Sequence, residues 1–168
     1  MTSNEIEEIT TKVYVKILNF LSYKMRSEKD VSDRIDEYLA KEHLPKEARS
    51  SAHDKIISRL TSEFYVNDAK YVDMYVDEIV RNKSKSIIEA KRFLFGKGID
   101  ENLIEEAFSK VSLDYELELA TGLAQKKFRT LSKDSPAKKK QKLTMFLARK
   151  GFSYDIIYSA VDSVLNLQ

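Results

Sequence analysis

The feature that most constrains this chain is a helix–turn–helix pattern that occurs more than once. In residues 138–165, apolar residues recur at intervals of three and four on both sides of Gly151. This spacing is typical of two amphipathic helices, and glycine commonly ends the first helix of such a pair because it adopts a positive φ without strain. Ser153 then has the right side chain and position to cap the second helix.

The same pattern recurs around Gly98, and more weakly in residues 35–56. When Gly98 is aligned with Gly151, the apolar positions on both sides coincide. In the weaker copy, His43 stands where the other two have glycine. Histidine tolerates a positive φ less well than glycine, so we expect a looser turn there. The coinciding pairs are Phe93 and Phe146, Leu94 and Leu147, Leu103 and Ile156, Ile104 and Ile157, Ala107 and Ala160, Phe108 and Val161, and Val111 and Val164.

Each copy is preceded by a further amphipathic segment, at residues 6–24, 69–81 and 115–128. Three helices per copy and a repeat of about fifty residues indicate stacked supersecondary units. With only 4 Gly and 2 Pro, little interrupts helix formation. We therefore predict an all-α protein of three tandem three-helix repeats. The predicted repeats are residues 1–62, 63–111 and 112–168.

Composition argues against several classes of site. The chain has no Cys, and its 2 His residues, His43 and His53, lack a third ligand nearby, so we expect neither a metal nor another cofactor. Neither a phosphate-binding glycine loop nor a catalytic triad is recognisable, which predicts that the protein is not an enzyme. Tyr75 falls on an apolar helical stripe, so core packing is preferred for it over base stacking. No membrane-spanning run or signal peptide is evident, and we expect a cytoplasmic protein.

Four stretches, taken in order, resemble the signature segments of the RecX family. The order and spacing carry the resemblance, since each short motif alone is common among helical proteins. The similarity runs from about residue 14 to the end of the sequence. The stretches are residues 21–31, 65–71, 97–99 and 146–153.

RecX proteins regulate the bacterial RecA recombinase, and the resemblance implies an elongated, curved array of three-helix repeats. It also implies the partners: a RecA filament on DNA, and single- or double-stranded DNA itself. By lodging in the filament groove, such a protein limits filament extension, ATP turnover and strand exchange in recombinational repair and the SOS response. We expect a monomer without a small-molecule substrate or a membrane partner.

Charge supports an anionic partner independently of the resemblance. Residues 126–150 hold ten basic residues and one acid, and residues 81–98 hold six and one, although the whole chain carries a net charge of only +2. Clustered cations of this kind favour phosphate, with no sign of base recognition. The residues favoured for these contacts are Lys138, Lys142, Arg149 and Lys150, then Lys126, Lys127, Arg129, Lys139 and Lys140, with Arg81, Lys85 and Arg92 in support.

Two alternatives stay open at this point. The lysines could simply solvate an exposed helix face, which is the ordinary role of charged residues on a helical protein. The chain could also be a sequence-independent DNA-binding protein that competes with RecA for DNA without contacting it.

Overall fold

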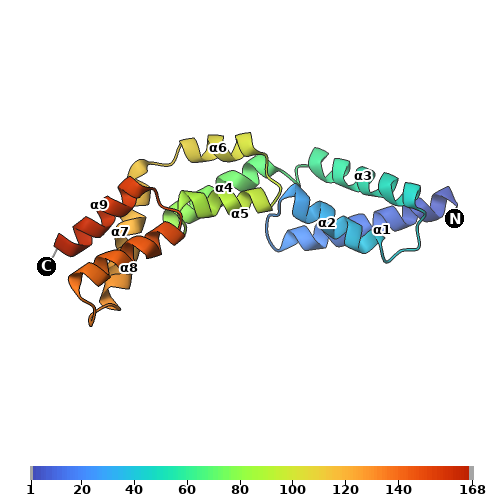
Figure 1. Cartoon of the computed structure of the whole chain (residues 1–168). Helices are drawn as coiled ribbons and strands as arrows, with labels where there is room; N and C mark the ends of the chain where they lie inside the picture. Colours follow the sequence, from blue (N-terminus) through green and yellow to red (C-terminus); the bar gives the residue numbers. More distant parts are fainter. Residues whose placement is uncertain (1, 167–168) are drawn as a thin grey trace. The chain divides into compact units, whose positions relative to one another are not determined.

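The computed structural model describes residues 2–166, with the side chain of residue 113 left aside, and within that range it contains nine helices and no strand (Figure 1). The predicted all-α class is confirmed. The helices are α1 (Ser3–Ser22), α2 (Glu28–Leu39), α3 (Lys46–Ser62), α4 (Asp68–Asn82), α5 (Ile87–Gly96), α6 (Glu101–Ser109), α7 (Leu113–Arg129), α8 (Pro136–Arg149) and α9 (Tyr154–Asn166).

The described chain forms two compact units. Unit 1 comprises the described residues up to 72 together with residues 97–100, and unit 2 comprises residues 73–96 and 101 onward. The boundaries of the three predicted repeats stay a prediction.

Unit 1 is built around the mutual packing of α1, α2 and α3. Ile17 of α1, Ile35 and Leu39 of α2, and Leu60 of α3 are fully buried in one cluster. Ser27 begins α2, where its hydroxyl accepts a hydrogen bond from the Asp30 amide at 3.2 Å. This cap satisfies one of the free amides of the first turn and fixes where α2 begins.

Unit 2 contains a second cluster, in which α9 packs against both α7 and α8. Leu143 and Leu147 of α8 are fully buried there. The connection between α4 and α5 is tied to this cluster by two hydroxyl groups. Tyr115 donates to the backbone carbonyl oxygens of Ile79 (3.1 Å) and Lys85 (2.5 Å), and buried Ser86 donates to that of Lys150 (2.6 Å). The α4–α5 connection is therefore positioned by contacts distant in sequence.

Both predicted glycine turns have the expected geometry. Gly98 has a φ of +75° and Gly151 a φ of +84°. At Gly151 a Cβ atom would lie 2.2 Å from Cγ2 of Ile88, so space as well as conformation requires glycine. Ser153 caps α9 as predicted, since its hydroxyl lies 3.5 Å from the Ile156 amide.

The turn at His43 differs from the glycine turns. Among the described non-glycine residues, positive φ occurs at Phe64 and Lys83, so His43 does not take the glycine conformation. Instead α2 ends at Leu39 and α3 begins at Lys46, which makes this connection longer than the one around Gly151. A longer connection reverses the chain without a left-handed residue, and the looser turn expected from the sequence is confirmed.

Candidate functional site

The outer side of α8 carries the cations that the sequence favoured. Leu143 and Leu147 are fully buried and define the inner side of this helix. Lys138, Lys142 and Arg149 fall on the opposite side at helical spacing, and all three are exposed. They form one row along α8 that faces away from the core.

The flanks of α8 hold further cations against aromatic rings. The Nζ atom of Lys139 lies 4.8 Å from the ring centroid of Phe128 on α7, and that of Lys127 lies 6.0 Å from the ring of Phe146. On the other flank, Nζ of Lys140 lies 5.7 Å from the ring of Tyr158 on α9. Such contacts hold long side chains in place while leaving the charge close to the surface.

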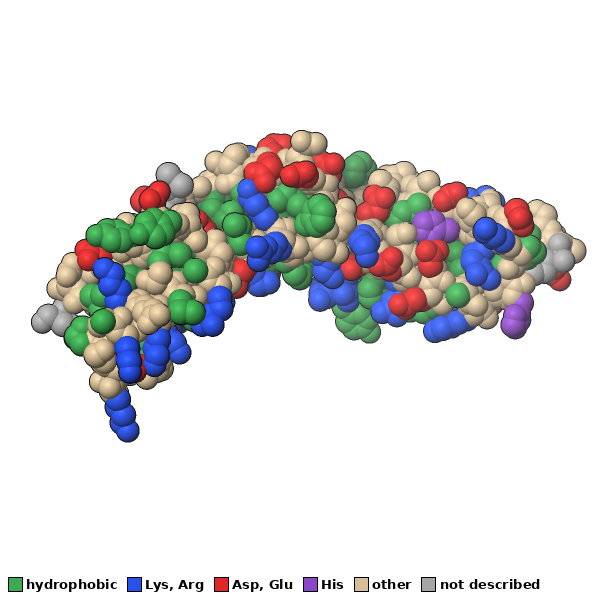
Figure 2. Space-filling model, viewed as in Figure 1, with side chains coloured by type: hydrophobic (Ala, Val, Ile, Leu, Met, Phe, Trp, Pro, Cys, Tyr) green, Lys and Arg blue, Asp and Glu red, His purple; other side chains and the backbone are tan. Residues whose placement is uncertain are grey.

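The end of α7 adds to the same surface. Lys126, Lys127 and Arg129 lie in its last turn, where cations also complement the negative end of the helix dipole. Figure 2 shows Lys and Arg side chains gathered over the α7–α8 end of unit 2, with few acidic side chains among them. We call this the α7–α8 surface and define it by Lys126, Lys127, Arg129, Lys138, Lys139, Lys140, Lys142 and Arg149.

Two of the four most favoured residues already have a carboxylate partner. Lys142 donates to Asp134 at 2.7 Å, and this hydrogen bond holds the pKa of Asp134 below its usual value. Lys150 pairs with Glu89 at 3.1 Å and thereby joins the end of α8 to α5. Lys138 and Arg149, in contrast, form no ion pair with the described residues. The unneutralised cations of α8 are therefore better placed for an external anion.

The supporting residues from the α4–α5 region do not join the α7–α8 surface through any contact among the described residues. Arg81 and Arg92 are exposed on their own helices. Lys85 is half-buried, with Nζ 3.2 Å from the hydroxyl of Tyr75. The ring of Tyr75 stacks on Phe93 at 4.8 Å, so Tyr75 packs against a neighbouring helix and is half-buried rather than enclosed in the core.

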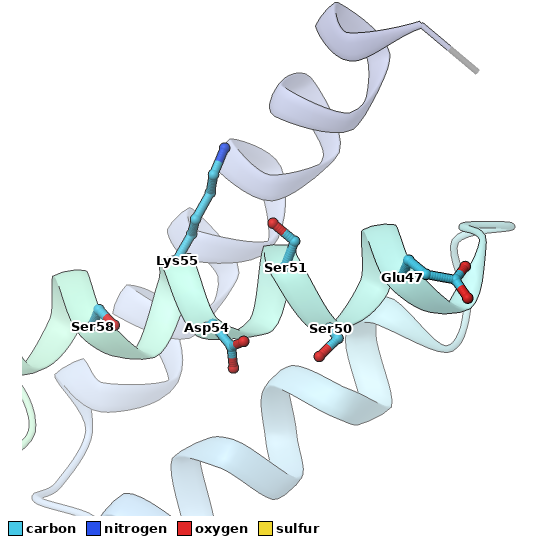
Figure 3. Close-up of a pocket in the computed structure, with 6 residues that line it drawn as sticks. All are labelled: Glu47, Ser50, Ser51, Asp54, Lys55 and Ser58. Carbon is cyan, nitrogen blue, oxygen red and sulfur yellow. The ribbon is translucent and has the colours of Figure 1, made fainter.

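The depression along α3 lacks the enclosed shape of an active site. A depression of about 690 Å³, open to solvent, runs along α3 and is lined by Glu47, Ser50, Ser51, Asp54, Lys55 and Ser58 (Figure 3). These side chains all come from one helix, and Figure 3 shows them spreading apart rather than converging on one point. An arrangement of this kind does not hold a substrate in one orientation.

His53 has a structural partner. Its Nε2 atom lies 2.9 Å from the hydroxyl of Ser32, which joins α3 to α2. Within residues 2–166, no three His, Cys, Asp or Glu side chains gather closely enough to hold a metal ion. No described helix is both long and apolar enough to cross a membrane.

A second group of cations, which no run of charge in the sequence marks, lies on unit 1, on α2 and on the connection between α1 and α2. Arg26 and Arg34 lie over one aromatic ring, Phe20, at 4.3 and 4.9 Å from its centroid. In the sequence these arginines stand among acidic residues, so no run of charge marks them. Only the packing of α2 on α1 brings them together.

Comparison with known proteins identifies the family. The family model described as the third three-helix domain of RecX matches residues 114–161, which lie within α7 to α9. The regulatory protein RecX of Clostridioides difficile is 32% identical over 160 residues, covering 95% of this chain and 71% of that protein. The chain belongs to the RecX family.

Other relatives and two crystal structures support the assignment to the RecX family. The regulatory proteins RecX of Bacillus pumilus and Bacillus subtilis are 35% and 33% identical and are matched over 57% and 55% of their length. The chain thus spans little more than half the length of these relatives. A crystal structure of RecX from Lactobacillus salivarius superposes with a TM-score of 0.77 at 30% identity, over 96% of this chain and 99% of that one. A second RecX crystal structure gives 0.78 at 27% identity, over 98% and 74%.

The RecX relatives are named regulatory proteins and not enzymes. The segment matched by the family model also contains much of the α7–α8 surface. The family therefore directs attention to binding by a charged exterior.

Proposed function

We propose that this chain binds the nucleoprotein filament of the RecA recombinase and limits its extension, ATP turnover and strand exchange. The observation that carries the proposal is membership of the RecX family of regulatory proteins. The activity belongs to recombinational repair and the SOS response, takes place in the cytoplasm, and requires one copy of the chain and no cofactor.

The cations of α8 support an anionic partner. Lys138 and Arg149 are exposed and unneutralised, and the filament offers DNA phosphates and protein carboxylates that such groups bind. Binding alone does not alter a filament, because a ligand with equal affinity for every state shifts no equilibrium. We infer that the chain binds more tightly to a filament state that neither extends nor completes its ATP cycle.

The first experiment tests whether RecA is the target. RecA filaments are formed on single-stranded DNA with ATP, and the chain is added at amounts too low to cover the free DNA. The proposal predicts that ATP hydrolysis falls under these substoichiometric conditions. If inhibition requires enough protein to saturate the DNA, the chain competes for DNA and the filament proposal is wrong.

The second experiment tests the surface. The double variant Lys138→Glu/Arg149→Glu removes the two unneutralised cations on the outer side of α8. We expect inhibition to require about tenfold more of this variant, because charge-assisted contacts of this kind contribute roughly 1–3 kcal/mol. The matched control is Lys46→Glu/Lys70→Glu, which changes the same net charge at exposed lysines of α3 and α4. Equal inhibition by both variants would remove the α7–α8 surface from the proposal.

A further inference from the structure

Unit 1 carries a second cationic surface, formed where α2 packs on α1. Four basic side chains surround two aromatic rings there. The ring of Phe20 contacts Arg26 and Arg34, and the ring of Tyr38 has Lys16 at 5.3 Å, Lys41 at 5.8 Å and Arg34 at 5.9 Å from its centroid. We call this the cation–aromatic strip and define it by Lys16, Phe20, Arg26, Arg34, Tyr38 and Lys41.

Arg26 is the unusual member of the strip. Its side chain is half-buried, and its Nε atom is buried with no hydrogen-bond partner among the described residues. No described carboxylate pairs with it. Arg49 also has a buried, unpartnered Nε, but its Nη2 atom lies 3.5 Å from the carbonyl oxygen of Leu44. A half-buried guanidinium normally finds an acceptor, so Arg26 holds donor capacity that the described chain does not use.

The carboxylates that pair with strip residues do not neutralise all of its cations. Arg34 pairs with Glu37 at 2.7 Å. Glu42 pairs with Lys12 at 3.0 Å and lies 4.0 Å from Lys16, and the hydrogen bond from Lys12 is the main cause that lowers the pKa of Glu42. These two carboxylates serve three cations, whereas Arg26 and Lys41 have no carboxylate partner among the described residues.

An exposed aromatic side chain precedes the unpaired arginine. Tyr23 ends α1 as its C-cap residue and is 86% exposed. An exposed tyrosine offers a face on which an unpaired base stacks, and stacking of this kind is tolerant of sequence. The strip and Tyr23, three residues before Arg26, therefore supply the two features that single-stranded nucleic acid needs, a phosphate contact and a stacking face.

We propose that the cation–aromatic strip, together with the neighbouring Tyr23, binds the backbone of single-stranded nucleic acid, with Arg26 contacting phosphate and Tyr23 stacking on a base. This inference rests on the proposed function, which already requires a polyanionic partner, and adds a site on unit 1. The planar fork of the guanidinium matches a phosphate with two parallel hydrogen bonds, and the ring of Phe20 holds it in place. The exposed ring of Tyr23 beside these cations in the sequence favours nucleic acid over an acidic protein surface, because a carboxylate does not stack on an aromatic ring.

A structural role is the competing explanation for Arg26. The last turn of α1 contains no basic residue, and a cation near Phe20 complements the negative end of the α1 dipole. That role predicts a change in stability when Arg26 is replaced, with no change in binding to nucleic acid. The two explanations therefore differ in a measurable way.

The test uses the full chain and a fluorescently labelled oligothymidylate, with binding followed by anisotropy over a range of salt concentrations. We expect Arg26→Gln to weaken binding about tenfold at low salt and to reduce the slope of log affinity against log salt by about 0.7, as for one lost contact to a single strand. The matched control is Lys46→Gln, which removes one charge from an exposed lysine outside the strip. Its affinity is expected to change less than about twofold.

Two further variants distinguish a loss of binding from a loss of folding. Arg26→Lys keeps the charge over Phe20 but loses the planar fork, so it retains the salt slope and binds more weakly than the parent chain. Tyr23→Ala replaces an exposed side chain, so it leaves helicity unchanged and weakens binding at least about fivefold. If Arg26→Gln and Tyr23→Ala both bind like Lys46→Gln, the inference is overturned. It is also overturned if Arg26→Gln loses affinity for polyglutamate but not for the oligonucleotide, which would identify an acidic protein as the partner.

Measuring RecA ATP hydrolysis in parallel separates this inference from the proposed function. If the parent chain binds the oligonucleotide through Arg26 but leaves RecA unaffected, the proposed function is wrong and the proposed site on unit 1 is supported. If the parent chain inhibits RecA and Arg26→Gln binds the oligonucleotide like the control, the proposed function is supported and the proposed site on unit 1 is wrong.

Discussion

The α2–α3 pair of unit 1 and the α8–α9 pair of unit 2 bury equivalent residues but join their helices differently. Leu39 and Leu147 are both fully buried, and Ala52 and Ala160 are enclosed to nearly the same degree. One pair turns through a longer connection without a left-handed residue, and the other turns tightly at Gly151. The comparison indicates that the two helix pairs share their buried apolar positions, whereas the conformation of the connecting turn differs between them.

The two units also differ in how their basic side chains are brought together. On α8 the basic residues follow closely in the sequence and point outward from one helix. On unit 1 the cations come from α1, from α2 and from the segments that follow these two helices, and they gather on Phe20 and Tyr38. The first surface is visible in a charge profile, whereas the second exists only after folding.

The largest expected effect tests whether the buried positions are equivalent. Leu39→Ala and Leu147→Ala each remove a fully buried side chain, so each is expected to lower the free energy of unfolding by about 2–5 kcal/mol. Chemical denaturation followed by circular dichroism measures both losses. A loss at one position several times that at the other would show that the two helix pairs do not share one packing scheme.

The turns are expected to respond unequally. Gly151→Ala places a Cβ against Ile88 at a φ of +84°, and we expect a loss of about 1–3 kcal/mol. His43→Gly should change stability by less than about 1 kcal/mol, because no positive φ is required there. Gly98→Ala is the intermediate case, since its Cβ would lie 2.8 Å from Cδ of Lys29, a less severe approach than the 2.2 Å to Ile88 at Gly151. If Gly151→Ala were no more harmful than Gly98→Ala, the close approach of Ile88 would not matter.

Much of the fold could be predicted because the apolar periodicity is local. Leu94 and Leu147 were aligned from the sequence, and both are fully buried. The cap at Ser153 followed from residue type and position alone. These features depend on neighbours within a few residues, which sequence reasoning describes well.

Features that depend on distant partners could not be predicted. Lys150 was favoured as an anion contact, but its partner Glu89 lies on another helix. Arg26 and Arg34 are separated by acidic residues and meet only over Phe20. Phe64 is an apolar residue just before α4, yet it is 81% exposed at a φ of 61°. Charge pairing and exposure of this kind are set by tertiary packing rather than by local pattern.

Alkaline titration compares a buried tyrosine of unit 1, Tyr14, with a half-buried tyrosine of unit 2, Tyr75. Burial raises the pKa of Tyr14 to about 12, with its hydrogen bond to Glu63 acting in the same direction, and burial raises the pKa of Tyr75 to about 12. A raised folded-state pKa contributes stability that is present below the unfolded value of 10.0 and is lost as the pH rises through about 12. We therefore expect the denaturant concentration at the unfolding midpoint to decrease as the pH is raised from 10.0 to about 12. Tyr14→Phe and Tyr75→Phe should each remove part of this pH dependence, and an unchanged profile in either would contradict the assigned cause.

The smallest expected effect concerns one exposed ion pair in each unit, Lys12 with Glu42 and Lys142 with Asp134. The lysine hydrogen bonds lower the pKa of both carboxyl groups below the values of the unfolded chain, 4.5 for Glu42 and 3.8 for Asp134. Each pair therefore stabilises the fold when the pH is above the unfolded-state pKa, and this stability is lost as the pH falls through the folded-state pKa. Glu42→Gln and Asp134→Asn should reduce the acid dependence of the denaturation midpoint slightly, and added salt should reduce it further.

An exposed pair of this strength has a consequence for binding. Since Asp134 contributes little to stability, Lys142 can exchange that carboxylate for a phosphate at small cost. Asp134→Asn should therefore leave folding almost unchanged and strengthen binding to the labelled oligothymidylate by about twofold, because one cation of the α7–α8 surface loses its internal competitor. A weaker affinity for Asp134→Asn would mean that Asp134 positions Lys142 for its partner, and the pair would then be part of the binding surface rather than a competitor of it.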